Sequence, residues 1–278
     1  KNGKFDDIVY KSWSKTKFES SSLNETFNIS PLIYKTIRSK KFYEKFYEKF
    51  KSNDQVDIIR SKVKAINPKV NETIVTTDTL EYSAEYVFSS ILDPTLIIKS
   101  KYPCLKQHFV GWIIKTEKPF FNEEEVVLMD FNISQDSKTR FMYVLPFNKK
   151  EALVEFTLFS RSLLKKEEYE DNIKRYLEKK EVSYEITKTE NGVIPMTSYP
   201  FEKNNKSRLL YIGTAGGWTK SSSGYTFKNI INKSEALIQF LKKGKPLNDF
   251  KVKSRYKFYD LLFLDVLFNY NHLGSEIF

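Results

Sequence analysis

The pattern of apolar and polar residues predicts a helix near the start of the chain, followed by several short strands. Between residues 31 and 50, aromatic side chains recur every three or four positions, which gives a helix one apolar stripe. Ser30 would cap this helix, and Pro31 would occupy its first turn. Strand-like runs follow at residues 56–66, 70–77, 79–82 and 86–88. We expect the second and third runs to form a hairpin and the fourth to be buried.

A block rich in β-branched and aromatic residues occupies the middle of the chain. Its runs at residues 108–114, 125–130, 140–146 and 152–159 predict strands, with turns at 132–138 and 148–150. The pattern then predicts a charged helix at 165–180, strands at 184–189 and 209–213, and helices at 225–243 and 256–268. Because βα units flank an antiparallel block, this order predicts an α/β fold with an α+β insertion, in which a second domain interrupts the first.

The composition is that of a globular protein, and its positive charge has two interpretations. Of the 278 residues, 40% are hydrophobic and 29% are charged, and the formal net charge is +11. The lysines are scattered in pairs and form no stripe between stacking aromatic residues, so we expect no nucleic-acid partner. The charge is either a solvated surface or an attraction to anionic lipid headgroups.

Cysteine, histidine and apolar runs narrow the choice further. The single cysteine, Cys104, rules out an intrachain disulfide, and two histidines argue against a metal cluster. A reducing cytoplasm suits this composition. The sequence has neither an apolar run of the length that spans a membrane nor a signal peptide. Because the chain begins at Lys1 and ends just after an apolar helix, we expect a fragment cut at both ends.

A glycine-rich turn between the strand at 209–213 and the next helix is the strongest candidate for a binding site. Glycines let the backbone approach a ligand closely, and a helix start offers free N–H groups to a phosphate or an electron-rich ring. The candidate cofactor-binding residues are Gly213, Thr214, Ala215, Gly216, Gly217, Ser223, Gly224 and Tyr225. No Gly-x-Gly-x-x-Gly follows a strand. Either the turn serves another purpose, or that fingerprint lies before Lys1.

Several stretches together resemble the lycopene cyclase family in the form found in carotenoid-making bacteria. They occur in the family's order and extend over nearly the whole chain. The stretches are residues 107–112, 128–131, 141–147, 152–159, 192–196, 212–217 and 223–227.

The resemblance implies a fold and a cofactor. The family has a split FAD/NAD(P)-binding Rossmann-like domain of the flavoprotein hydroxylase type, with an inserted antiparallel β-sheet substrate domain. We therefore assign residues 1–100 and 205–245 to the FAD-binding domain, 101–204 to the substrate domain, and 246–278 to a C-terminal helical segment. The family's N-terminal βαβ unit, with the glycine fingerprint, would be missing. The implied cofactor is FAD in its reduced form, with NAD(P)H as reductant.

The resemblance also implies an activity, the redox-neutral closure of the ends of lycopene or a related acyclic carotenoid into β-rings. Glu155 occupies the first acidic position of the family's acidic motif and would protonate the terminal double bond. Plant members have a second acid next, but here it is Phe156, which puts any role for paired carboxylates in doubt. Strand alternation places Glu155 on the face of Leu153 and Thr157, where desolvation would raise its pKa. The alternative is a glutamate at a sheet edge facing solvent.

Other residues in the matching stretches have two interpretations each. Asp130 is a candidate proton acceptor or orienting group, or a structural residue at a strand end. Trp112, Tyr143 and Met196 would suit a polyene tunnel, or would simply pack in the core. Glu190 and Arg140 are candidates because they lie in matching stretches, or each simply forms an ion pair. His108 would pack or hydrogen-bond within its strand, or touch the substrate.

Because the implied substrate lives in the bilayer, we expect a cytoplasmic enzyme held peripherally at the inner face of the membrane. The last helix, behind Lys251, Lys253, Arg255 and Lys257, would dock there or pack on another segment. Two other readings remain open. One is an FAD-dependent oxidoreductase or monooxygenase acting on an isoprenoid or lipid, and the other is a non-catalytic carotenoid- or lipid-binding protein.

Overall fold

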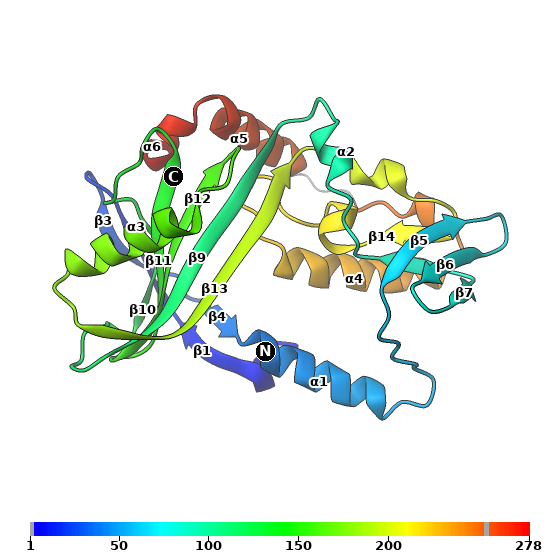
Figure 1. Cartoon of the computed structure of the whole chain (residues 1–278), viewed down its shortest axis with the longest axis horizontal. Helices are drawn as coiled ribbons and strands as arrows, with labels where there is room; N and C mark the ends of the chain where they lie inside the picture. The colour runs from blue at the N-terminus through cyan, green and yellow to red at the C-terminus, as the bar shows by residue number, and fades with distance from the viewer. Residues whose placement is uncertain (1–2, 253–255) are drawn as a thin grey trace.

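The computed structural model describes residues 3–252 and 256–278, and it places a long sheet beside a smaller assembly of strands and helices (Figure 1). The sheet fills the left of the view, with helix α3 (Lys166–Glu178) across its front. The smaller assembly, on the right, holds helix α4 (Phe227–Leu241) and several short strands. Among the residues described, no helix reaches the length and hydropathy needed to cross a membrane.

Seven strands form the large sheet. Its order is β13-β9-β12-β11-β10-β2-β3, antiparallel throughout except for the parallel pair β10–β2. The bounds are β2 (Lys15–Glu19), β3 (Asn24–Asn28), β9 (Cys104–Thr116), β10 (Glu125–Asp130), β11 (Thr139–Asn148), β12 (Glu151–Ser160) and β13 (Tyr184–Thr197). The predicted antiparallel block is therefore confirmed. It is wider than predicted, because β2 and β3 come from residues assigned to the FAD-binding domain; the domain boundaries themselves stay a prediction.

Strand β13 runs eight residues beyond the end predicted for it at position 189. Asn191 and Gly192 are typical turn residues, which is why the sequence suggested an end there. In the structure Gly192 pairs with Phe109 of β9, and a Cβ at Gly192 would lie only 2.5 Å from the Phe109 ring. The glycine therefore makes room for an aromatic ring within a continuous strand.

The two faces of the sheet carry different cores. Val154, Phe156 and Leu158 of β12 pack against α3, with Ile173 and Leu177 at the centre of that contact. On the opposite face, the core is closed at one end by helix α5 (Lys257–Asn269) and at the other by strands β1 (Val9–Trp13) and β4 (Tyr34–Ile37). Alternate residues of a central strand therefore point either to the core under α3 or to the core on the opposite face.

The prediction of a helix at residues 31–50 is wrong for residues 31–38. Helix α1 spans Ser39–Lys51, and residues 34–37 instead form β4, which pairs antiparallel with β1. Ser30 therefore caps no helix, and the Ser30–Pro31 peptide is cis. The aromatic stripe is real within α1, where Phe42 and Phe46 pack against Phe5. Pairing with a distant strand outweighed the local periodicity.

The smaller assembly contains two separate sheets. Strands β5 (Val63–Pro68), β6 (Thr73–Thr77) and β7 (Glu81–Ala84) form an antiparallel meander, while β8 (Val87–Ser89) pairs parallel with β14 (Leu209–Tyr211). The predicted hairpin is confirmed. The strand predicted at 56–66 begins only at Val63, and β8 is not buried as predicted, since Phe88 is 40% exposed. Two short helices complete the chain, α2 (Thr95–Ile98) and α6 (Gly274–Ile277).

Candidate active site

Glu155 lies on a central strand of the large sheet, with its side chain sealed from water. Strand β12 is paired on both sides, by β9 and β11, so the alternative of an edge glutamate facing solvent is wrong. The residue is 8% exposed, and Thr157 Oγ1 donates a hydrogen bond of 2.5 Å to its carboxyl. Burial raises the pKa of Glu155 to about 8, with Glu190 adding to the shift and Thr157 opposing it. At neutral pH this carboxyl therefore retains its proton.

A row of residues crosses four strands at the level of Glu155. Tyr143 of β11 pairs with Glu155, Glu155 pairs with Gly111 of β9, and Gly111 pairs with Glu190 of β13. A Cβ at Gly111 would lie 3.4 Å from Glu155 Cβ, 3.2 Å from Glu190 Cγ and 2.9 Å from Leu153 Cδ1. The two glutamates therefore flank a position that only glycine leaves free.

A pair of tyrosines closes one side of Glu155. The hydroxyls of Tyr34 and Tyr143 lie 2.6 Å apart and share a hydrogen bond, which joins β4 to β11. Burial raises the pKa of Tyr143 well above its ordinary value, and Tyr34, Glu155 and Glu190 raise it further. Burial also raises the pKa of Tyr34, with smaller contributions from Tyr225 and Glu155. These phenols are neutral hydrogen-bonding groups beside the acid.

The glycine-rich turn presents free backbone donors beside open space. Gly213–Gly216 form a short 3-10 turn after β14, and Gly213 and Gly217 have φ of +59° and +66°. Among the residues described, the N–H groups of Gly213, Thr214 and Ala215 have no hydrogen-bond partner, and a Cβ at Gly213 would meet no atom within 4 Å. An electron-rich or anionic group fits this concave backbone.

The glycine-rich turn and Glu155 lie against the same face of the sheet. A Cβ at Gly224 would lie 1.9 Å from Gln107 Oε1, so the loop that follows the turn presses directly on β9. Gln107 precedes Gly111 by four residues, which places the two contacts about 13 Å apart along one face of the strand. Ser221 Oγ also donates to the carbonyl of Thr197 on β13. The structure therefore brings the predicted cofactor residues and Glu155 to one side of the sheet.

Asp130 lies on the opposite face, so the structure does not bring it together with Glu155. It is 1% exposed, and it accepts hydrogen bonds of 2.9 Å from Tyr176 Oη of α3 and from the backbone N–H of Asn132. Burial raises the pKa of Asp130, and a hydrogen bond shared with Glu19 raises it further. Glu19 and Tyr176 line a cavity of about 210 Å³ between the sheet and α3. These contacts match the structural alternative for Asp130.

The predicted tunnel residues are divided between the two faces. Trp112 packs in the core under α3, opposite Glu155, because it pairs with Val154. Tyr143 lies beside Glu155, whereas Met196 shares the face of Glu155 but is fully buried between the sheet and α5. Only Tyr143 of the three therefore lies next to the acid.

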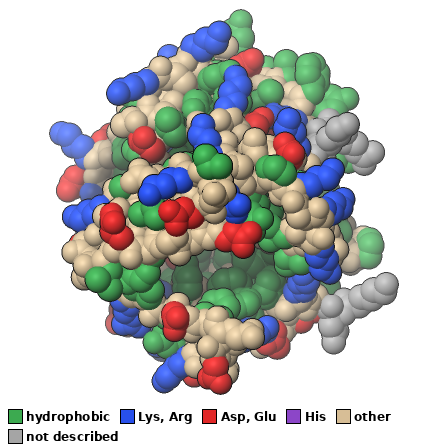
Figure 2. All heavy atoms as spheres, turned by 90° about the vertical axis from the view of Figure 1, so that its right-hand side faces the viewer, with side chains coloured by type: hydrophobic (Ala, Val, Ile, Leu, Met, Phe, Trp, Pro, Cys, Tyr) green, Lys and Arg blue, Asp and Glu red, His purple; other side chains and the backbone are tan. Residues whose placement is uncertain are grey.

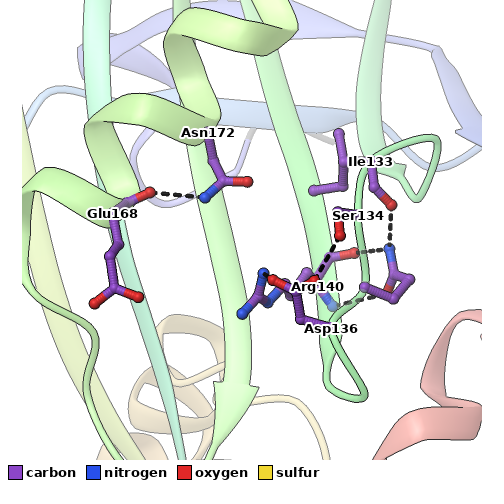
Figure 3. Close-up of polar contacts among 7 residues, drawn as sticks. Ile133, Ser134, Asp136, Arg140, Glu168 and Asn172 are labelled. Carbon is purple, nitrogen blue, oxygen red and sulfur yellow. Dashed lines mark hydrogen bonds and ion pairs between the residues drawn. The ribbon is translucent and has the colours of Figure 1, made fainter.

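The remaining side chains named from the sequence have clear partners, with one exception. Arg140 forms the expected ion pair with Asp136 in the loop between β10 and β11, near α3 (Figure 3). His108 is fully buried and bonds to Ser160 Oγ at 2.8 Å and Tyr169 Oη at 2.6 Å. Glu190 forms no ion pair within the described part of the chain, so the structure does not support the ion-pair interpretation of this residue.

Seen from the side that carries the β5–β7 meander, the surface is hollowed (Figure 2). The hollow lies at a height between α4 and α1, and hydrophobic side chains line it. Outside the undescribed positions, no group of three or more histidine, cysteine, aspartate or glutamate side chains is arranged to hold a metal ion.

A protein family described as "Lycopene cyclase protein" matches residues 1–260 of the sequence. The chain belongs to the lycopene cyclase family. Among curated proteins, no match is found for it. The resemblance inferred from the sequence stretches is thereby confirmed over nearly the whole chain of this lycopene cyclase family member.

Several solved structures share the fold of this lycopene cyclase family member at low sequence identity. A geranylgeranyl bacteriochlorophyll reductase-like protein from Thermoplasma acidophilum matches with a TM-score of 0.62 and 11% identity, covering 99% of this chain and 72% of its own. HpxO from Klebsiella pneumoniae, solved in complex with FAD, gives 0.58 and 10%, with coverages of 98% and 76%. A flavoprotein/dehydrogenase from Cytophaga hutchinsonii gives 0.56 and 14%, with coverages of 96% and 70%. The predicted fold class is confirmed.

The raised pKa of Glu155 predicts a pH-dependent penalty on stability. The folded protein holds this proton up to about pH 8, whereas an unfolded glutamate releases it near 4.5, so the free energy of unfolding should fall as the pH rises between those values. Relative to Glu155→Gln, the wild type should lose up to about 1.4 kcal/mol per pH unit within this window. Urea unfolding of both proteins at pH 5, 6.5 and 8 measures the difference. A constant difference would contradict a buried, protonated Glu155.

Proposed function

We propose that this protein is a lycopene β-cyclase, which closes the acyclic ends of lycopene into β-rings by protonation and without net redox change. The observation that carries the proposal is the state of Glu155. It is a buried carboxyl that keeps its proton near neutral pH, on the sheet face that also holds the glycine-rich turn. Only an uncharged, desolvated acid protonates an alkene usefully, because a hydrated carboxylate has no proton to give.

The proposed reaction begins with transfer of the Glu155 proton to the terminal carbon–carbon double bond. The tertiary cation that results is attacked by a nearby double bond of the same chain, which closes a six-membered ring. Loss of a proton next to the new cation then restores a double bond, so substrate and product have the same mass. Asp130 is not assigned as the proton acceptor, because it lies across the sheet from Glu155.

Tyr34 and Tyr143 would support this reaction without transferring protons. Both phenols have raised pKa values and are therefore neutral, and their hydroxyls bond to each other. Their ring faces are electron-rich and suit a cation formed beside Glu155. Trp13 adds an apolar wall from β1, because it packs against Leu153 and Tyr143. These residues would also exclude water that could quench the cation.

FAD is the proposed cofactor, and the glycine-rich turn suits it. Gly213, Thr214 and Ala215 offer unpaired N–H donors next to open space, as an electron-rich flavin ring or a phosphate requires. Reduced FAD, with NAD(P)H as the proposed reductant, would supply negative charge that stabilises a nearby cation. HpxO, which shares this fold, is described with FAD bound.

The substrate is proposed to come from a membrane, to which the protein would bind peripherally on the cytoplasmic side. Helix α5 turns Leu264 and Leu267 into the core, with Phe263 and Phe268 packed against it, so these four side chains are not free for docking. At its first turns, however, Phe258 is 68% exposed and Leu262 is 53% exposed, and Lys251 and Lys257 are exposed nearby in the chain. Lys253 and Arg255, also assigned to this surface, lie outside the described residues.

Glu155→Gln should abolish ring formation, since glutamine offers no acidic proton to the alkene. The complete gene, expressed in a lycopene-accumulating bacterium, should give cyclised pigment, and the Glu155→Gln gene should leave lycopene unchanged on chromatography. Glu151→Gln is the matched control, because it makes the same change four residues earlier on β12, at the turn. A wild-type gene that produces reduced or oxygenated pigment would favour the oxidoreductase instead, and cyclised pigment from Glu155→Gln would remove this residue from the mechanism.

Gly213→Ala should weaken flavin binding, whatever the activity. An alanine strains the backbone at φ +59° and puts a methyl group into the open space beside the free N–H groups. Gly244→Ala is the matched control, because Gly244 has φ +61° and the same open surroundings but lies beyond the end of α4. Absorbance of the purified full-length proteins measures flavin content. Equal flavin in both variants would argue against the turn as a cofactor site.

Replacing Phe258 and Leu262 together by serine should reduce binding to vesicles containing phosphatidylglycerol by about tenfold or more, because two apolar contacts with the bilayer are lost. Cosedimentation measures the bound fraction. Val70 and Leu80, 86% and 62% exposed around the β5–β7 meander, provide a control pair for the same change. A similar loss in both double variants would indicate that α5 has no special part in binding.

A further inference from the structure

Glu155 is sealed from solvent, yet in the proposed reaction it gives up a proton in every cycle. A carboxyl that is 8% exposed on a central strand has no direct contact with bulk water through which to recover that proton. Glu190 lies two strands away, on β13, which is the edge strand of the sheet. Unlike Glu155, Glu190 is exposed. Of the two glutamates that flank Gly111, Glu190 is therefore the one that contacts bulk water.

Gly111 allows the two acids to approach each other. Two strand spacings separate their backbones by about 10 Å, which is the combined reach of two glutamate side chains that lean together. Both side chains border the space over this glycine, because a single Cβ placed there would lie 3.2 Å from Glu190 Cγ and 3.4 Å from Glu155 Cβ. The Glu155 carboxyl accepts its hydrogen bond from Thr157 on the same strand, so it would turn across this space to meet Glu190. Any other residue at position 111 would put a side chain between the two carboxyls.

We propose that Glu190 carries protons between solvent and Glu155 across the gap left by Gly111. The inference rests on the proposed function, because a proton-initiated cyclisation is what requires Glu155 to be reloaded. After Glu155 has protonated the substrate, its carboxylate takes a proton from the Glu190 carboxyl, and the Glu190 carboxylate takes one from water. The substrate returns one proton to solvent when its double bond is restored, so no proton is consumed over the cycle.

The charged and titratable groups around the two acids suit one shared proton. Desolvation is the main cause that raises the pKa of each glutamate, because the neighbouring strand covers one side of Glu190 even though its other side reaches water, and Glu190 adds to the shift of Glu155. Tyr143 of β11 and Tyr34 of β4 face the pair as neutral phenols, so neither provides a countercharge. Lys188, on β13, lowers the pKa of Glu190 alone. Glu190 therefore releases its proton more readily on the solvent side, and ionisation of both acids at once is disfavoured.

In this scheme Glu190 does not touch the substrate. It acts through Glu155, because it returns a proton to that carboxyl after each reaction. Position 156 next to Glu155 is a phenylalanine, and in this scheme the second acid comes instead from another strand, β13. A purely structural Glu190 would affect stability but would not affect how fast the proton of Glu155 exchanges with water. The test therefore needs to follow that proton.

Infrared spectroscopy of the full-length protein follows the protonated carboxyl of Glu155 directly, and the band lost in Glu155→Gln identifies it. After rapid mixing into D₂O, Glu190→Gln should exchange this proton at least about tenfold more slowly than the wild type, with a lower titration midpoint for Glu155. Glu185→Gln, the same change on β13 beside Lys115, should leave both quantities unchanged. Glu190→Asp, which keeps a carboxyl, should restore part of the exchange rate.

One further variant and a kinetic measurement complete the test. If Glu190→Gln does not fold, Gly111→Ala keeps both acids but separates them with a methyl group, and it should slow exchange in the same way. In the cyclase reaction, Glu190→Gln should lower kcat by about tenfold or more without raising KM for the carotenoid, because its effect is on proton recovery. Unchanged exchange in both Glu190→Gln and Gly111→Ala would overturn the proposal.

The infrared result does not depend on the reaction. Slow exchange in Glu190→Gln, in a protein whose wild type leaves lycopene acyclic, would establish the proton path and refute the cyclase assignment. Normal exchange in a protein that does cyclise lycopene would support the proposed function and refute the part given to Glu190.

Discussion

The structure depends above all on keeping one carboxyl out of water. Ionising a buried glutamate costs several kcal/mol of free energy unless a positive charge compensates, and none of the groups that perturb Glu155 is positive. The fold surrounds it with Thr157, two neutral tyrosines, a glycine and a second acid. Each of these tolerates the protonated form, and none stabilises the anion strongly. The groups that surround Glu155 in the sheet therefore favour its protonated form over its anion.

The two faces of the sheet explain why some polar residues are chemical candidates and others are structural. On the α3 face, Asp130, His108 and Arg140 all have partners within reach, and each bond ties the sheet to the helix or to a nearby loop. On the opposite face, which the loop after the glycine-rich turn contacts, Glu155 accepts one hydrogen bond, from Thr157, and Glu190 forms no side-chain hydrogen bond or ion pair within the described residues. Glu155 and Glu190 are therefore held by fewer partners than Asp130, and they lie on the face where the proposed substrate and cofactor would meet.

Much of this site could be predicted from the sequence where the determining contacts are local. Alternation along β12 correctly placed Glu155 with Leu153 and Thr157, and the glycines before α4 marked the turn. What local patterns do not contain is the register between strands. That register puts Trp112 and Asp130 under α3, and it pairs Gly111 with both acids. The signal that could have suggested Glu190 was a second glutamate in a later strand, next to a glycine-containing stretch, but only the strand pairing shows that both glutamates flank Gly111.

The tyrosine pair beside Glu155 links positions 109 residues apart in the chain. Trp13 and Tyr34 belong to β1 and β4 near the start of the chain, whereas β11 and β12 lie near its middle. Contact between these strands therefore closes a long loop of the chain. Long-range closures of this kind tend to form late in folding. Docking of the N-terminal strands therefore completes the enclosure that raises the pKa of Glu155. Its unusual affinity for a proton is consequently a product of the finished tertiary structure, and it also reports on whether that structure is complete.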